Sequence, residues 1–249
     1  MWAINEDGDF RLFAKQNVFQ LNDTHPTIAV AELMRLFIDE YDMPWDNAWE
    51  ITCDTMAYTN HTLLPEALEK WSVSLFEQLL PRLLEIIYEI NARFLAQVAQ
   101  RWPGDTDRLR RLSIIEEGHT PMVRMAYLAI VGSYSVNGVA ELHSQLLKDG
   151  LFRDFYELWP DKFNNKTNGV TQRRWLAMCN PGLSALINER IGDGWVIRLD
   201  ELRELAPYAD DKAFQQRWRE VKLANKQRLA DMVERDCGVK LDTSALFDV

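Results

Sequence analysis

Two short polar segments lie between apolar stretches, and each offers several hydrogen-bonding groups. The first is Tyr-Thr-Asn-His-Thr at residues 58–62, and the second is Asn-Lys-Thr-Asn-Gly at residues 165–169. Fixed donors and acceptors of this kind, combined with aromatic surfaces, recognise sugar hydroxyls. The alternative is that the Asn and Thr side chains cap helices and satisfy buried backbone groups. Composition alone favours this structural alternative.

The remaining patterns exclude several common kinds of site. None of the four histidines has a partner at the i, i+4 spacing of a helical metal pair, so we predict no metal centre; they are His25, His61, His119 and His143. The chain also has no glycine-rich phosphate loop, no serine nucleophile elbow and no dinucleotide fingerprint. Motifs of these kinds therefore leave the function open.

Composition and charge narrow the class of protein. The 249 residues are 47% apolar, enough for a sizeable core, and the formal net charge is −10. No global positive field would attract nucleic acid or an anionic membrane. The three cysteines are odd in number and widely separated, which favours a reducing, cytoplasmic compartment. We predict neither a secretory signal in residues 1–15 nor a membrane span in the charge-free run 125–140.

Hydrophobic spacing predicts the elements that must position the polar segments. A strand over residues 18–22 feeds an amphipathic helix over residues 26–41, and a second helix runs from about residue 46 to residue 56. The first polar segment, 58–62, then falls at an element boundary. The second polar segment belongs to a polar stretch, 164–174, that reads as a functional loop or a domain crossing.

Two apolar runs lie between these segments. Residues 75–98 are long for one helix and contain Pro81, so they form either one kinked helix or two helices that meet there. Residues 122–136 are apolar nearly all round, which predicts a buried helix that Asn137 and Gly138 end.

The charged parts of the chain read as surface helices. Arg108, Arg110 and Arg111 follow two aspartates, and we expect them on a solvated helix face. The last part of the chain predicts helices over residues 181–191, 199–205 and 212–234, and a strand that begins at 246–249.

Six motifs carry a resemblance to a known family. They are QLNDTHP at residues 20–26, YTNHTLLPEAL at 58–68, IIYEIN at 86–91, VNGVA at 136–140, KTNGVT at 166–171 and RRW at 173–175. In sequence and in order they are similar to the α-glucan phosphorylases, which act on glycogen, maltodextrin or starch. The likeness covers residues 18–249, and residues 1–17 do not match.

The resemblance implies an α/β fold of the GT-B type, in which the active site lies between two domains. Residues 18–173 would be the last part of an N-terminal, glucan-binding domain. Residues 174–249 would begin a C-terminal, cofactor-binding domain. We therefore expect an incomplete, predominantly helical α/β chain whose parent enzyme is a cytoplasmic homodimer.

The family reaction implied by the resemblance is phosphorolysis. Inorganic phosphate releases glucose 1-phosphate from the end of an α-1,4-glucan, with retained configuration. No carboxylate pair of the glycoside hydrolase kind is needed, because phosphate itself protonates the leaving oxygen. The phosphate group of pyridoxal 5'-phosphate supports that proton transfer, and fixed dipoles stabilise the cation-like sugar.

The resemblance also assigns roles to single residues. His61 would place its main-chain carbonyl beside the reacting sugar and its imidazole on a sugar hydroxyl. Asn168 would hydrogen-bond the glucose hydroxyls. The other matching positions are Val139 and Thr62 in the pocket wall, Asp23 and His25 along the channel, and Trp175 beside the cofactor.

Some positions depart from the family pattern or fall outside it. Gln172 stands where the family has proline, and His143 is expected to have a structural role. The cofactor lysine is expected beyond Val249, so we expect no turnover from the chain by itself. Three interpretations stay open: part of an active phosphorylase, a non-catalytic glucan-binding remnant, or a truncated gene product.

Overall fold

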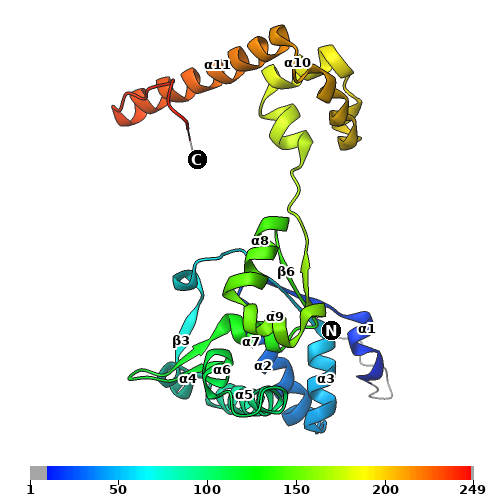
Figure 1. Cartoon of the computed structure of the whole chain (residues 1–249), viewed down its shortest axis with the longest axis vertical. Coiled ribbons are helices and arrows are strands. Elements are labelled where there is room, and N and C mark those ends of the chain that lie inside the picture. Colours follow the sequence, from blue (N-terminus) through cyan, green and yellow to red (C-terminus); the bar gives the residue numbers. More distant parts are fainter. Residues whose placement is uncertain (1–9, 248–249) are drawn as a thin grey trace. The chain divides into compact units, whose positions relative to one another are not determined.

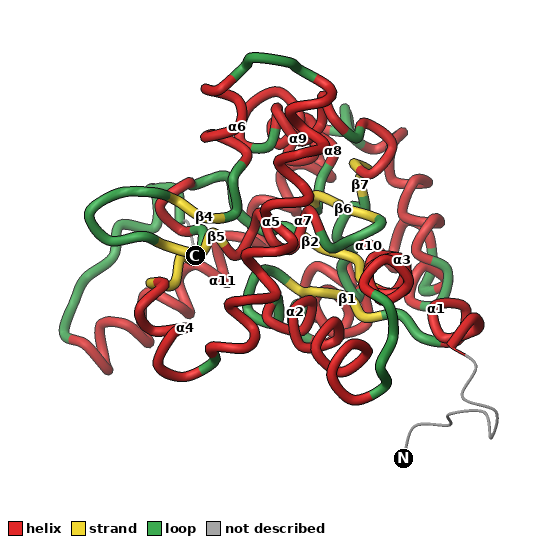
Figure 2. The backbone as a smooth tube through the Cα atoms, turned by 90° about the horizontal axis from the view of Figure 1, so that it is seen from below, coloured by secondary structure: helices red, strands yellow, loops and turns green. Residues whose placement is uncertain are grey.

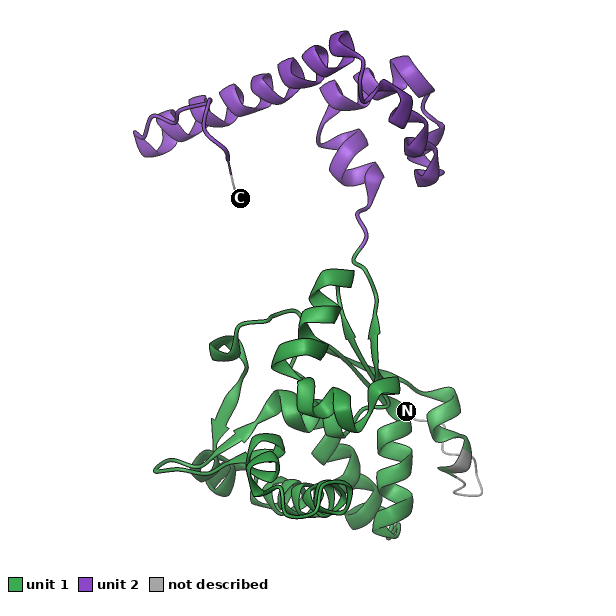
Figure 3. Cartoon of the chain, viewed as in Figure 1, with its two compact units in different colours: residues 1–168 green, residues 169–249 purple. Residues whose placement is uncertain are grey.

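A computed structural model describes residues 10–247 of the chain. The chain divides into two compact units, Met1–Asn168 and Gly169–Val249, which Figure 3 shows in green and purple. The first unit combines helices with β-sheet, and the described residues of the second form helices and loops. The predicted α/β class with predominantly helical content is confirmed.

A parallel sheet lies at the centre of the first unit. Its strands follow the order β1 (Phe19–Asn22), β2 (Met56–Thr59), β6 (Ser135–Gly138) and β7 (Phe163–Asn165). Every neighbouring pair is parallel, so the carboxyl ends of all four strands meet at one edge. Figure 2 shows these strands in yellow, side by side, with red helices around them.

The helices of the first unit cover this sheet and a smaller one (Figure 1). They are α1 (Phe13–Gln16), α2 (Ile28–Arg35), α3 (Trp45–Thr55), α4 (Val73–Leu79), α5 (Pro81–Arg101), α6 (Thr106–Leu112), α7 (Met125–Val131), α8 (Glu141–Leu146) and α9 (Arg153–Leu158). The smaller sheet is antiparallel, in the order β3 (Lys70–Ser72), β5 (Met122–Arg124) and β4 (Ile115–Glu116). Two π-helical turns, Leu36–Glu40 and Leu147–Leu151, extend α2 and α8.

Pro81 separates two helices rather than kinking one. α4 ends at Leu79 and α5 begins at Pro81. Proline has no backbone N–H and fits the first turn of a helix, where that donor would have no partner. The apolar stripe of α5 is buried against the core through Ile87, Ile90 and Phe94, among others.

The prediction of one buried helix over residues 122–136 is wrong. The run contains the strand β5, the helix α7 and the start of the strand β6. α7 closes at Gly132, and Ser133 and Tyr134 lead into β6. A buried parallel strand and a buried helix are both apolar on every side, so periodicity does not separate them. Asn137 and Gly138 lie inside β6 and do not end a helix.

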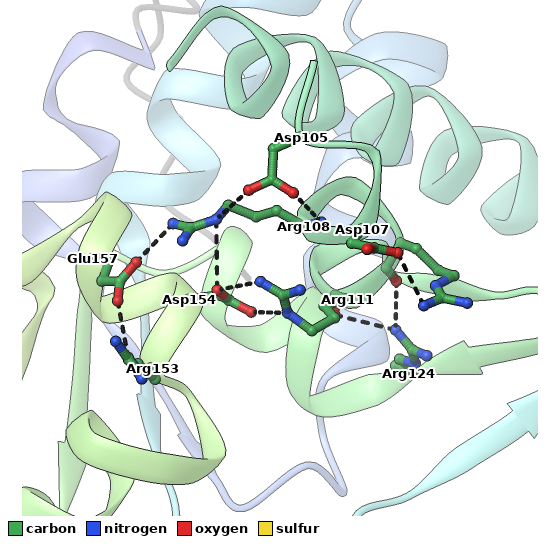
Figure 4. A network of polar contacts seen from close by, with 9 residues as sticks. Asp105, Asp107, Arg108, Arg111, Arg124, Arg153, Asp154 and Glu157 are labelled. Atoms are coloured by element: carbon green, nitrogen blue, oxygen red, sulfur yellow. Dashed lines mark hydrogen bonds and ion pairs between the residues drawn. The ribbon is translucent and has the colours of Figure 1, made fainter. Parts of the chain in front are cut away.

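The basic cluster of α6 is only in part the solvated face that we predicted. Arg108 is only 15% exposed and lies 3.7 Å from Asp154 and 2.7 Å from Glu157, both on α9 (Figure 4). Arg111 Nε donates to Asp154 Oδ2 at 2.7 Å. Arg110 and Arg111, whose side chains are 75% and 50% exposed, fit the prediction. These partners come from α9, far along the chain, so the local charge pattern gave no sign of them.

The second unit has its own small core. α10 (Pro181–Ile191) and α11 (Lys212–Cys237) match two predicted helices, and a 3-10 helix, Leu199–Tyr208, stands where a third was expected. Trp195 is fully buried, and its indole Nε1 donates to Asn188 Oδ1 at 2.8 Å. The side chain of Gln172 donates to the carbonyl of Val196 at 3.0 Å, a bond that proline could not make.

The expected C-terminal strand is not found. Leu246 and Phe247 form no strand, and residues 248–249 lie outside the described residues. Residues 1–9 lie outside them as well. Within residues 10–247, no helix is both long and apolar enough to span a bilayer.

The buried Asn91 of α5 generates a stability prediction. Its Oδ1 accepts from the backbone N–H of Ile114 at 2.8 Å, and its Nδ2 donates to Ser113 Oγ at 3.2 Å. Asn91→Ala leaves the Ile114 N–H buried without an acceptor, which costs about 1–3 kcal/mol. We expect urea unfolding followed by circular dichroism to show this loss. The control is Asn47→Ala, which changes an exposed side chain of α3 and should alter the free energy of unfolding by less than about 0.5 kcal/mol. Equal losses of stability in the two variants would contradict the prediction.

Candidate functional site

The polar residues of interest follow the carboxyl ends of the four parallel strands. Asp23 follows β1, His61 follows β2, Val139 follows β6, and Asn168 follows β7 by three residues. In open parallel sheets, ligands bind in the crevice outside these strand ends. The topology therefore gathers residues that are far apart in sequence at the edge where such sheets bind ligands.

Asn60 fixes the chain where it leaves β2. Its backbone N–H donates to the carbonyl of Asn137 at 2.9 Å, which continues the ladder between β2 and β6 by one residue. Its side chain is fully buried, and Oδ1 accepts from the Thr62 N–H at 3.0 Å. Nδ2 donates to the hydroxyl of Tyr58 at 3.2 Å. This side chain therefore holds the turn that presents His61 and Thr62.

His61 is exposed at the sheet edge, where a ligand can reach it. Its Nε2 lies 2.6 Å from Asn22 Oδ1, at the end of β1. An amide oxygen only accepts, so Nε2 carries the proton and Nδ1 is left as an acceptor. Thr62, next to it, is partly buried. The exposed neutral imidazole can therefore accept a hydrogen bond at Nδ1 while Asn22 holds its ring.

Val139 is bonded through both of its backbone groups. Its N–H donates to His143 Nδ1 at 3.0 Å, and its carbonyl accepts from the Asn168 N–H at 2.9 Å. The carbonyl of Gly138 likewise accepts from the Lys166 N–H at 3.1 Å. The loop after β7 is thus fastened along the end of β6, and it holds the exposed Asn168 there.

His143 joins the ends of β2 and β6. Because Nδ1 accepts from Val139, the neutral ring carries its proton on Nε2, which donates to Asn60 Oδ1 at 3.0 Å. Burial, together with the nearby His61, lowers the pKa of His143 below its ordinary value. Both causes favour the neutral imidazole, the form that these two hydrogen bonds require.

Gly138 allows α8 to approach the strand end. A Cβ at this position would lie 2.5 Å from Ser144 Oγ, and 2.9 Å from both His143 Nδ1 and Ser144 Cα. Ser144 Oγ in turn donates to Asn165 Oδ1 at 3.0 Å, which ties α8 to β7. The absence of a side chain at Gly138 is therefore what brings His143 within reach of Val139.

The two predicted channel residues lie in different surroundings. Asp23 adopts a left-handed conformation (φ 63°), its N–H donates to the carbonyl of Thr59, and its Oδ1 accepts from the Thr24 N–H at 2.7 Å. Asp tolerates this conformation better than most residues. His25 lines a mostly apolar cavity of about 170 Å³, whose wall includes Trp71. Asp23 is thus hydrogen-bonded to the end of β2, and His25 lies beside α4.

Trp175 belongs to the second unit. It lies in the π-helical segment Arg173–Met178, and its side chain is 64% exposed. Within the described residues, no cluster of three or more His, Cys, Asp or Glu side chains could hold a metal ion.

Asn60 and His143 are the residues whose part in the site the sequence did not reveal. Asn60 stands inside the polar run 58–62, but nothing in the run separates it from its neighbours. His143 was expected to be structural, and its bond to Asn60 spans 83 residues. The one local sign is its position four residues after Val139, within reach of that backbone N–H.

The close contact at Gly138 predicts the effect of adding a methyl group. Gly138→Ala should push α8 from the strand end and cost about 1–3 kcal/mol of stability through overpacking. Gly150→Ala is a matched control, because a Cβ there would meet nothing within 4 Å. Chemical denaturation and the amide NMR shift of Val139 measure both effects. Wild-type values for Gly138→Ala would refute the close approach.

The lowered pKa of His143 predicts a pH dependence. The folded state favours the neutral ring, so its contribution to stability is complete above about pH 6.5 and is lost as the pH falls through the lowered pKa. An NMR titration of the His143 Cε1–H resonance should have its midpoint below about 6.5. A midpoint above that value would mean that the ring is held as a cation.

The chain is similar to known proteins over nearly all of its length. A model of the carbohydrate phosphorylase family matches residues 2–249, so the likeness extends into residues 2–17, which we expected not to match. A glycogen phosphorylase of Synechocystis sp. is 59% identical over 246 residues, 99% of this chain and 29% of that protein. The muscle form of glycogen phosphorylase from Oryctolagus cuniculus is 55% identical over 241 residues, 97% of this chain and 29% of that protein. The chain thus spans less than a third of the length of these relatives. It belongs to the carbohydrate phosphorylase family.

Proposed function

We propose that this chain supplies the sugar-binding wall of an α-1,4-glucan phosphorylase. Such an enzyme releases glucose 1-phosphate from the ends of glycogen or maltodextrin with inorganic phosphate. The observation that carries the proposal is the hydrogen-bonded chain from Asn60 through His143 and Val139 to Asn168. It fixes the backbone around residues that match sugar contacts in the family, and it leaves the side chains of His61 and Asn168 exposed.

The proposed roles follow from what each group can offer. The carbonyl of His61 is a fixed dipole whose negative end can stabilise a cation-like sugar, and its imidazole binds a sugar hydroxyl. The side-chain amide of Asn168 both donates and accepts, as paired glucose hydroxyls require. Val139 and Thr62 line the same wall, and Asp23 and His25 lie along the channel that leads to it. A fixed network suits this task because preorganised dipoles need no rearrangement during the reaction.

Pyridoxal 5'-phosphate is the cofactor that the family implies. When bound, it supplies a phosphate group that supports proton transfer to the leaving oxygen. Of the residues here, Trp175 is the proposed neighbour of the cofactor. Its exposed indole has area free to pack against an aromatic ring, so the residue fits that task.

The organisation of the parent enzyme is part of the same proposal. Residues 18–173 would belong to a glucan-binding domain, and residues 174–249 to the start of a cofactor-binding domain of a GT-B-type enzyme. The division of the chain into two compact units, Met1–Asn168 and Gly169–Val249, supports such an organisation. We further propose a homodimer that works in the cytoplasm.

A chimera tests the proposed activity. The 246 matching residues of the Synechocystis glycogen phosphorylase are replaced by this chain, and glucose 1-phosphate formation from maltodextrin and phosphate is assayed. We expect cofactor-dependent turnover within about tenfold of the unmodified relative, because the sugar-binding wall is supplied intact. A folded, cofactor-loaded chimera that binds maltodextrin without turnover would instead support a non-catalytic glucan-binding protein.

Two substitutions in the chimera test the site. His61→Ala and Asn168→Ala remove contacts that act mainly in the transition state, so each should lower kcat by about 10²-fold. Gln145→Ala is the control, because its side chain is exposed and donates to Asp149 in the π-helical turn Leu147–Leu151. Unchanged kcat in both His61→Ala and Asn168→Ala would remove the site assignment.

A further inference from the structure

We propose that His143 is a positioning residue for turnover: it sets the distance between the turn that carries His61 and the backbone of Val139, which anchors Asn168. The proposal rests on the proposed function, because it concerns the same site. It assigns a role in the reaction to a residue that matches none of the family's sugar contacts. His143 would act through its two ring nitrogens and would not touch the substrate.

The imidazole is the bridge between two strand ends. On one side Nδ1 accepts from the backbone of Val139 at 3.0 Å, directly after β6. On the other side Nε2 donates to the buried Oδ1 of Asn60 at 3.0 Å, directly after β2. The same oxygen accepts from the Thr62 N–H at 3.0 Å. One ring therefore sets the distance between the turn that carries His61 and the residue that anchors Asn168.

Only one state of the ring can do this. Val139 offers a donor and Asn60 Oδ1 an acceptor, so the ring must be neutral with its proton on Nε2. A proton on Nδ1 would face the Val139 N–H and break that bond. The titratable group that faces the ring is His61 on the β2 side. Glu141, in the first turn of α8, is exposed, and its carboxylate accepts from Asn165.

The position of the ring is itself fixed. Gly138 leaves room for α8 at the strand end, and Ser144, next to His143, bonds to Asn165 of β7. The helix therefore holds the imidazole between β2 and β6. A displacement of about 1 Å at catalytic groups can lower turnover by about 10²-fold, so loss of this bridge should affect the reaction.

Three variants of the chimera separate the two bonds. His143→Asn places an acceptor near the position of Nδ1 and keeps the bond to Val139, but it cannot reach Asn60. His143→Gln places a donor near the position of Nε2 and keeps the bond to Asn60, but it frees the Val139 N–H. His143→Ala loses both. We expect kcat to fall about tenfold in the first two and about 10²-fold in the third, with less than a threefold change in the KM for long maltodextrins.

A merely structural role predicts a different pattern. It would lower the unfolding midpoint and leave the kcat of the folded fraction unchanged. Each variant is therefore assayed at a temperature where circular dichroism shows it to be folded. The proposal is overturned if any of the three keeps the kcat of the unmodified chimera under that condition, or if the loss appears in KM alone.

An independent measurement on the 249-residue chain itself keeps the two proposals apart. Long-range ¹H–¹⁵N NMR spectra should show His143 as the tautomer with the proton on Nε2, and a proton on Nδ1 would overturn the bridge whatever the chimera does. An inactive unmodified chimera would contradict the proposed function and leave the tautomer result standing. An active chimera with unaffected His143 variants would contradict only the positioning role.

Discussion

The parallel pairing of β2 with β6 is the constraint on which the site depends. Thr59 lies opposite Asn137, and the backbone N–H of Asn60 continues the ladder to the carbonyl of Asn137. Tyr58 and Val136 are fully buried, and a shift of one residue would remove both from their packing partners, so close packing on the two faces of the sheet fixes the register. Once that register is set, Asn60 and Val139 leave the sheet at the same edge, and a single imidazole can join them.

Buried polar groups then convert the edge of the sheet into a rigid surface. Asn60 is fully buried, and its side chain is bonded through both its oxygen and its nitrogen. A buried polar network whose groups are all hydrogen-bonded makes its surroundings rigid. Removing one partner costs more stability than replacing both partners by apolar side chains of the same shape. The exposed groups, His61 and Asn168, therefore stand on backbone that cannot shift easily. Such preorganisation is what a site needs when it stabilises developing charge with dipoles and not with a protein nucleophile.

The sequence predicted local structure better than long-range contacts. Apolar periodicity located α2, α3, α10 and α11, and Pro81 was recognised as the position of either a kink or a boundary between two helices. The run over residues 122–136 was misread because a buried strand and a buried helix have the same composition. Arg108 was misread because its partners Asp154 and Glu157 come from α9, which only the fold brings near.

The candidate site shows the same limit. His61 and Asn168 were named from their likeness to a family, since their types and spacing alone favoured a capping role. Asn60 and His143 could not be linked from the sequence, because their bond spans 83 residues and depends on the pairing of β2 with β6. Gly138 was predicted to end a helix, whereas in the structure its lack of a side chain allows α8 to approach the strand end. Such contacts depend on the topology of the chain, and the spacing of apolar residues does not show which distant residues the topology brings together.

The most direct test of the account is a crystal structure of the chimera with a bound maltooligosaccharide. We expect a glucose residue whose hydroxyls lie about 3 Å from the His61 imidazole and from the Asn168 side-chain amide. The hydrogen-bonded bridge from Asn60 through His143 to Val139 should be unchanged. A glucan that is fully occupied elsewhere on this chain, with no sugar at His61 or Asn168, would contradict it.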